Sequence, residues 1–88
     1  MPGWKIEFTK SAEKDFAKLN ISIRQKVAER LEWLIKNFDD VVLRELTGEF
    51  RGFYKLRAGD WRVLYDVDWK NNCVVVVKVG HRSKIYKR

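Results

Sequence analysis

The run of β-branched residues near the C-terminus most limits the folds open to this chain. Residues 74–77 are four consecutive valines, preceded by Cys73 and followed by Lys78 and Val79. A strand with one solvated face alternates apolar and polar residues, whereas a strand covered on both faces is continuously apolar. We therefore predict a central strand over residues 73–79, with helices on one face and other apolar groups on the other.

Two further strands are predicted before the valine run, over residues 53–57 and 61–68. Both segments are rich in aromatic and β-branched residues, which favour strands. Gly59 and Asp60 separate the first strand from the second, and residues 69–72 supply the next turn. Because such short connections join antiparallel neighbours, the three strands are predicted to form an antiparallel meander.

The first half of the chain predicts one strand and two helices. Residues 4–8 alternate apolar and polar, and Thr9 then suits the N-cap of a helix. A second, longer helix carries an apolar stripe from Val27 to Phe38, which we interpret as core, and Ser22 with Gln25 has the spacing of a capping box.

The predicted fold class is α+β, in the order of one N-terminal strand, a two-helix hairpin and the meander, with a loop over residues 39–52. Residues 1–88 are expected to form a single compact domain, because 88 residues leave room for only one core.

Composition excludes several classes of protein. No apolar run approaches the roughly 18 residues of a membrane span, and the N-terminus lacks the apolar stretch of a signal peptide. We therefore expect a cytoplasmic protein that makes no membrane contact. Cys73 and His81 are the sole residues of their types, so we predict no internal disulfide, no structural zinc and no cofactor.

The positive charge is confined to one part of the chain. Residues 1–50 hold nine basic and nine acidic residues, whereas residues 51–88 hold ten basic and three acidic ones, which accounts for the net charge of +7. Such asymmetry points to a polyanionic partner, with nucleic acid ahead of an acidic protein and an anionic membrane. A purely solubilising role for the charge is the alternative.

The turn between the first two strands of the meander predicts a cluster of cations. If Gly59 and Asp60 form a two-residue turn, Arg57 lies opposite Arg62, and Lys55 shares their face. Like charges in opposing positions destabilise a sheet unless an anion lies between them. The cluster therefore predicts a phosphate site, although side chains that simply extend into solvent would also fit.

The C-terminal segment extends this predicted site. The meander brings Gly80 and its neighbours beside Arg62, and a register difference of one residue decides whether His81 or Arg82 shares its face. The sequence leaves both registers open. Tyr86 follows closely enough to stack on a base over the same patch, or else to fill the core.

The chain resembles the RelE family of bacterial and archaeal toxins in two segments, residues 54–65 (YKLRAGDWRVLY) and 79–86 (VGHRSKIY). The resemblance spans nearly the whole chain and implies the fold predicted above. It also implies an enzyme, an endoribonuclease that cleaves messenger RNA in the ribosomal A site, and a cognate RelB-like antitoxin. The same motifs mark the wider RelE/ParE superfamily, which includes gyrase-directed toxins.

Four residues match the family's motif positions and are therefore implied to be catalytic: Lys55, Arg62, Arg82 and Tyr86. The chain departs from the family at Phe53, where the best-known members place a lysine, and its spacing from arginine to tyrosine is shorter. As a hypothesis, the substrate's 2′-hydroxyl attacks the adjacent phosphate without a metal, so DNA would be inert.

The two arginines would then stabilise the transition state, because it carries extra negative charge on the phosphate oxygens. Lys55 and His81 are the rival general bases: a lysine needs neighbouring cations to lower its pKa, whereas a free histidine titrates near ~6.5. Four further residues are predicted to bind flanking phosphates or ribosomal RNA: Arg51, Arg57, His81 and Lys84.

Two other functions explain the basic half of the chain. A non-enzymatic ribosomal-RNA-binding protein needs only phosphate contacts and aromatic stacking. A gyrase inhibitor would act through a protein surface. The apolar strand edges and the helix stripe are the surfaces expected to bind an antitoxin.

Overall fold

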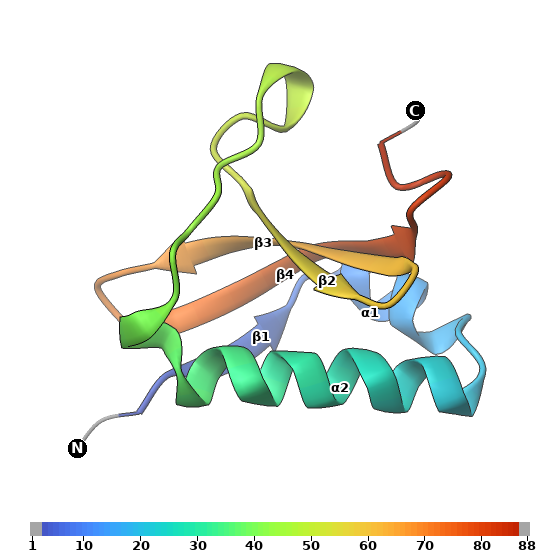
Figure 1. The fold of residues 1–88 in the computed structure, drawn as a ribbon, viewed down its shortest axis with the longest axis horizontal. Helices are drawn as coiled ribbons and strands as arrows, with labels where there is room; N and C mark the ends of the chain where they lie inside the picture. Colours follow the sequence, from blue (N-terminus) through green and yellow to red (C-terminus); the bar gives the residue numbers. More distant parts are fainter. Residues whose placement is uncertain (1–2, 87–88) are drawn as a thin grey trace.

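The valine-rich strand lies inside a four-stranded sheet in a computed structural model that describes residues 3–86. The strand order is β1-β4-β3-β2 (Figure 1). Strand β4 (Cys73–His81) pairs in parallel with β1 (Lys5–Phe8) and antiparallel with β3 (Trp61–Asp68), which pairs antiparallel with the edge strand β2 (Tyr54–Ala58). The predicted α+β fold, the meander and the central position of the valines are confirmed.

Two helices cover one face of this sheet, which we call the helix face. Helix α1 (Lys10–Ala17) packs against β4, and the longer α2 (Ile21–Lys36) runs along β2 (Figure 1). The apolar stripe of α2 is buried at Val27, Leu31 and Leu34, as predicted. Alternate strand residues complete this core, among them Leu56, Val63, Tyr65, Val74 and Val76.

Short polar side chains begin both helices. The Thr9 hydroxyl accepts a hydrogen bond from the Ala12 N–H at 3.1 Å, which confirms the predicted cap of the first helix. In the second helix Asn20 is the cap, since its side-chain oxygen accepts from the Ile23 N–H at 3.0 Å. The capping box predicted from Ser22 is therefore wrong: the Ser22 hydroxyl instead donates to Asn20, and the helix already begins at Ile21.

A two-residue turn and a β-bulge set the register of the meander. Gly59 has a positive φ of 64°, and the predicted pairing of Arg57 with Arg62 is present. Between β3 and β4, Leu64 pairs with Lys78 but Tyr65 pairs with Val76, so one residue of β4 is unpaired. The bulge places Lys78 on the face opposite Val76, although the two are an even number of residues apart.

The other face of the sheet, which we call the open face, is partly covered by irregular chain. The 3₁₀ turn η1 (Phe38–Asp40) lies at the end of α2, where Phe38 belongs to the core of the helix face, and from there the chain rises to the 3₁₀ turn η2 (Gly48–Phe50) on the open side (Figure 1). The turns after β4 rise on the same side (Figure 1). Ile85 is buried against Gly80, where an added Cβ would lie 3.1 Å from the Ile85 side chain. Glycine at position 80 therefore lets the C-terminal turns fold back onto the sheet. Over residues 3–86, no helix has both the length and the apolar character needed to cross a bilayer.

The buried Tyr65 predicts a loss of stability at high pH. Burial, with a smaller contribution from Tyr54, raises the pKa of Tyr65 from 10.0 to about 12. As the pH rises from about 10 to about 12, the unfolded chain loses this proton before the folded protein does, so the free energy of unfolding should fall. The fall is at most roughly 2.7 kcal/mol, and less where solvent screens the hydroxyl.

Urea denaturation of wild type and Tyr65→Phe across this pH range tests the prediction. The variant lacks the titrating group, so its stability should decline less steeply than that of the wild type. Parallel curves for the two proteins would contradict the assignment to Tyr65.

Candidate functional site

Two rows of residues cross the open face of the sheet. One row is Arg57, Arg62 and Gly80, and the next is Lys55, Leu64 and Lys78. Neighbouring strands lie ~4.8 Å apart, so the outer residues of each row are roughly 10 Å apart. The face that was predicted to gather cations therefore includes Lys78, which the sequence analysis missed because its orientation depends on the bulge.

Arg62 is buried although it carries a charge. The residue is 8% exposed, and Nη1 donates to the carbonyl oxygens of Gly59 at 2.8 Å and Trp61 at 2.9 Å. Within residues 3–86 no carboxylate forms an ion pair with it. Carbonyl oxygens fix the guanidinium but do not neutralise it, so a bound anion would offset the cost of burying this charge.

Arg82 is held at the same turn. Its backbone N–H donates to the Asp60 carbonyl at 2.8 Å, and its Nε lies 3.7 Å from a carboxylate oxygen of Asp60. The Arg82 side chain remains 62% exposed, so this ion pair is weak and readily exchanged for another anion. One hairpin turn thus positions both arginines that the sequence singled out.

His81 lies on the other side of the strand end. It pairs with Trp61, and their ring centroids are 5.3 Å apart, edge to face. Its Nδ1 accepts from the Ser83 N–H at 3.2 Å. Because residues alternate along a strand, His81 faces the helix side, whereas Arg62 lies opposite Gly80 on the open face. The structure thus has the register in which His81 does not share the face of Arg62.

An aromatic pair overhangs the open face. The ring centroids of Tyr86 and Phe50 lie 5.9 Å apart, and the Lys78 ammonium lies 5.2 Å from the centroid of the Phe50 ring. Tyr86 is 40% exposed, which favours a stacking ring over core filling, the two interpretations left open above. Phe50 belongs to η2, and its sequence position in a loop gave no sign that it would lie here.

The remaining predicted residues surround this cluster. Lys55 is half-buried in the row beside that of Arg62, while Arg57 is exposed and accepts a hydrogen bond at its carbonyl from Arg30. Arg51 directly follows Phe50, and Lys84 lies in the C-terminal turns; both are exposed. Over residues 3–86 no three carboxylate, histidine or cysteine side chains converge as metal ligands would.

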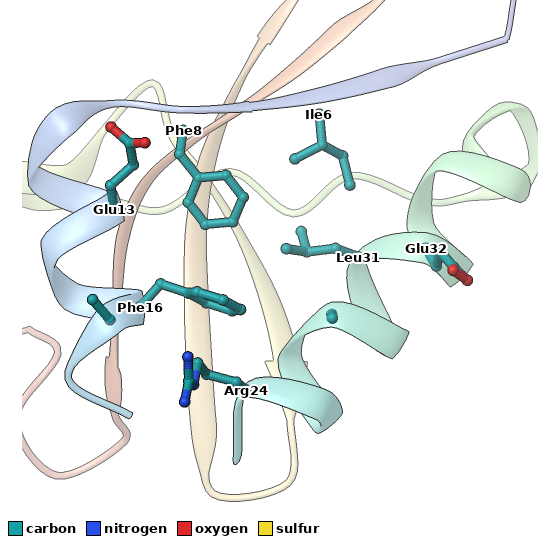
Figure 2. A pocket seen from close by; sticks show the side chains of 9 residues that line it. Ile6, Phe8, Glu13, Phe16, Arg24, Leu31 and Glu32 are labelled. Carbon is teal, nitrogen blue, oxygen red and sulfur yellow. The ribbon is translucent and has the colours of Figure 1, made fainter. Parts of the chain in front are cut away.

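A separate, mainly apolar groove of about 510 Å³ lies between β1 and the two helices. Phe8, Phe16 and Leu31 point toward one another inside it (Figure 2). Arg24 also lines the groove, and its Nε is buried without a hydrogen-bond partner in the described part of the chain. Leu31 is itself buried, in agreement with the prediction that the apolar stripe of this helix belongs to the core, whereas Phe8 and Phe16 are half-buried.

Comparisons of the sequence with known proteins identify its relatives. Residues 6–86 match the family model described as the ParE toxin of the type II toxin–antitoxin system parDE. The chain is 32% identical over 85 residues to Toxin RelG of Mycobacterium tuberculosis, covering 97% of this chain and 98% of that protein.

Solved structures give the same result. The toxin–antitoxin complex RelBE2 of Mycobacterium tuberculosis contains a chain of 31% identity with a TM-score of 0.78, covering 91% of this chain and 99% of that one. The isolated E. coli RelE toxin is 26% identical with a TM-score of 0.72, covering 94% and 90%. The chain therefore belongs to the ParE toxin family within the RelE/ParE superfamily, as a toxin of a type II toxin–antitoxin system.

Proposed function

We propose that this toxin is a ribosome-dependent endoribonuclease that cleaves messenger RNA in the A site and so inhibits translation. The observation that carries the proposal is the placement of Arg62 and Arg82 at one turn, with Arg62 buried and held only by neutral carbonyl groups. Arg62 has no carboxylate partner within residues 3–86, and the exposed ion pair of Arg82 with Asp60 is weak, so both oriented cations can stabilise a phosphorane-like transition state. The chain is similar to RelG and RelE toxins, and the resemblance to the RelE family, which implies cleavage of messenger RNA, supports the choice of RNA chemistry.

In the proposed reaction the 2′-oxygen of the substrate attacks the adjacent phosphorus, and the bond to the 5′-oxygen breaks. The 2′-hydroxyl gives its proton to a base and the departing 5′-oxygen takes a proton from water, so the products are a 2′,3′-cyclic phosphate and a free 5′-hydroxyl. Arg62 and Arg82 donate hydrogen bonds to the nonbridging oxygens, whose negative charge grows in the transition state. The mechanism needs a 2′-hydroxyl, so DNA is not cleaved.

The placement of the side chains favours Lys55 over His81 as the group that acts on the 2′-hydroxyl. Lys55 projects from the open face beside Arg62, whereas His81 faces the helix side and accepts from Ser83. We assign Lys55 to accept the proton or to add positive charge, and His81 to hold the turn at the strand end. Tyr86, beside Phe50, is assigned to stack on the base next to the scissile phosphate.

The outer cations are assigned to binding rather than to chemistry. Arg51, Arg57 and Lys84 are exposed around the cluster, where they can contact flanking phosphates or ribosomal RNA. Lys78 joins this group because it lies on the same face.

Arg82→Ala should separate catalysis from binding. Loss of one oriented donor typically costs on the order of 3 kcal/mol, so cleavage of ribosome-bound message should fall about a hundredfold. Affinity for the ribosome should fall only a few-fold, since many other cations remain. Mapping of message ends after induction gives the first quantity, and co-sedimentation with ribosomes gives the second.

Arg51→Ala is the matched control, because it removes an exposed arginine that is not at the hairpin turn. Equal proportional losses of cleavage and affinity in Arg82→Ala would indicate a non-enzymatic ribosomal-RNA-binding protein. Growth arrest with intact messages and accumulating DNA breaks would indicate a gyrase-directed toxin, the function known for some members of the superfamily.

A second pair of variants tests the assignment of the base. Lys55→Met should reduce the rate of cleavage about a hundredfold or more, whereas His81→Gln should reduce it by no more than a few-fold. The opposite ranking would make His81 the base and would require the strand end to rearrange on the ribosome.

The apolar groove beside β1 is proposed as the binding site for a RelB-like antitoxin. Relatives of this chain were solved as toxin–antitoxin complexes. The groove combines the half-buried rings of Phe8 and Phe16 with the Nε of Arg24, which has no hydrogen-bond partner among residues 3–86. An antitoxin segment would bury the rings and supply an acceptor to Arg24, which removes the cost of an unsatisfied buried donor.

Ala28→Arg should weaken antitoxin binding at least tenfold, because the new side chain occupies the groove that Ala28 lines from α2. Isothermal titration with the cognate antitoxin measures the change. Gln25→Arg adds the same charge to the same helix without lining the groove and should bind as wild type does. Unchanged affinity in Ala28→Arg would place the antitoxin elsewhere.

A further inference from the structure

A second basic surface lies at the outer edge of β2, beside the proposed cleavage site, with which it shares Lys55 and Arg57. Two adjoining hollows, of about 380 and 410 Å³, share Arg30 and Trp33. We call them together the β2-edge groove. The cations that line it are Lys26, Arg30, Arg44, Lys55 and Arg57, against two acids, Glu29 and Asp40.

This concentration of charge is a product of folding. Lys26, Arg30 and Arg44 come from residues 1–50, which have no net charge in the sequence. The fold places α2 and the chain after it beside β2, so that these cations join Lys55 and Arg57. The groove therefore has an excess of positive charge that could not be read from the distribution along the chain.

Trp33 is held in the groove with its ring partly free. The Arg30 guanidinium carbon lies 4.5 Å from the centroid of the Trp33 ring, and Arg30 Nε donates to the Arg57 carbonyl at 2.9 Å. One cation thus fixes the indole and ties α2 to the edge of β2. Trp33 nevertheless remains 43% exposed, which leaves ring surface on which a base can stack.

Part of the backbone at the outer edge of β2 already forms hydrogen bonds with other segments. The Leu46 N–H donates to the Phe53 carbonyl at 2.9 Å, Glu45 forms an isolated bridge with Tyr54, and Arg30 occupies the Arg57 carbonyl. A protein strand that added to this edge would have to displace these contacts. A ligand recognised by charge and stacking fits better than one recognised by backbone pairing.

We propose that the β2-edge groove binds single-stranded RNA next to the segment that is cleaved. A base stacks on Trp33, and the phosphates on either side contact Lys26, Arg30 and Arg44. Lys55 and Arg57 border both the groove and the open face, so an RNA strand can pass from one to the other around β2. The inference extends the proposed function and rests on it in taking RNA as the ligand.

Fluorescence anisotropy with a labelled oligouridine of about ten nucleotides tests the proposal. Its riboses are 2′-O-methylated, so the probe has no hydroxyl to attack and reports binding alone. Trp33→Ala should weaken binding about tenfold, since stacking contributes roughly 1–3 kcal/mol per base. Trp33→Phe should recover part of the loss, whereas Trp33→Leu, which keeps apolar bulk without an aromatic face, should not.

The salt dependence supplies an independent measurement. Arg44→Gln should lower the slope of log Kd against log salt concentration by about 0.7, the value for one phosphate contact on a single strand. Lys36→Gln is the matched control, because Lys36 is on α2 and pairs with Glu32 outside the groove; it should leave both the affinity and the slope unchanged.

Wild-type affinity in Trp33→Ala would overturn the groove as an RNA site. Displacement of the probe by polyglutamate as readily as by unlabelled RNA would also overturn it, and would indicate an acidic protein as the partner. Neither result depends on cleavage. If the nuclease proposal failed instead, the wild-type toxin would leave messages intact, or Arg82→Ala would cut them as the wild type does, while the effect of Trp33→Ala on the uncleavable probe would persist.

Discussion

The carbonyl groups of the Gly59–Asp60 turn organise the charged face of this toxin. Two of the carbonyls at this hairpin, those of Gly59 and Trp61, fix the guanidinium of Arg62, and the Asp60 carbonyl holds the backbone of Arg82. Gly59 adopts a positive φ that a residue with a side chain rarely adopts. A change in this turn would therefore disturb both arginines at once, although they are far apart in the sequence.

The two faces of the sheet have different roles: the helix face stabilises the fold, and the open face carries the candidate site. The helix face buries most of the apolar side chains of the chain, and it can supply the hydrophobic free energy that a domain of this size needs. Among residues 3–86 the open face buries fewer apolar side chains, including Leu64, Cys73 and Ile85. Cations and exposed rings can occupy the rest of this face because folding does not depend on burying it.

The two edges of the sheet also differ in the side chains that line the grooves beside them. The groove beside β1 is lined mainly by apolar side chains, with the Nε of Arg24 lacking a hydrogen-bond partner in the described residues. The groove beside β2 instead carries five cations and an exposed tryptophan. The first has the chemistry of a protein interface and the second that of a nucleic-acid interface. On the proposals made above, antitoxin and RNA would approach this toxin from opposite edges.

The sequence by itself determined the order of elements, the central valine strand and the hairpin that pairs Arg57 with Arg62. These features depend on local periodicity and on turn residues, which a single sequence records directly. The misplaced cap of the second helix had a local cause too, since Asn20 and Ser22 are both competent caps and only the backbone geometry selects between them.

Only the tertiary structure decided which distant side chains meet. The bulge in β4 turned Lys78 to the open face, the register placed His81 on the opposite side from Arg62, and the loop brought Phe50 to Tyr86. The packing of α2 against β2 assembled the basic groove from residues of a neutral segment. Each of these results depends on contacts between segments far apart in the chain. A shift of one residue in the pairing of two strands turns every side chain of the shifted strand to the other face of the sheet, yet it leaves the sequence pattern almost unaltered.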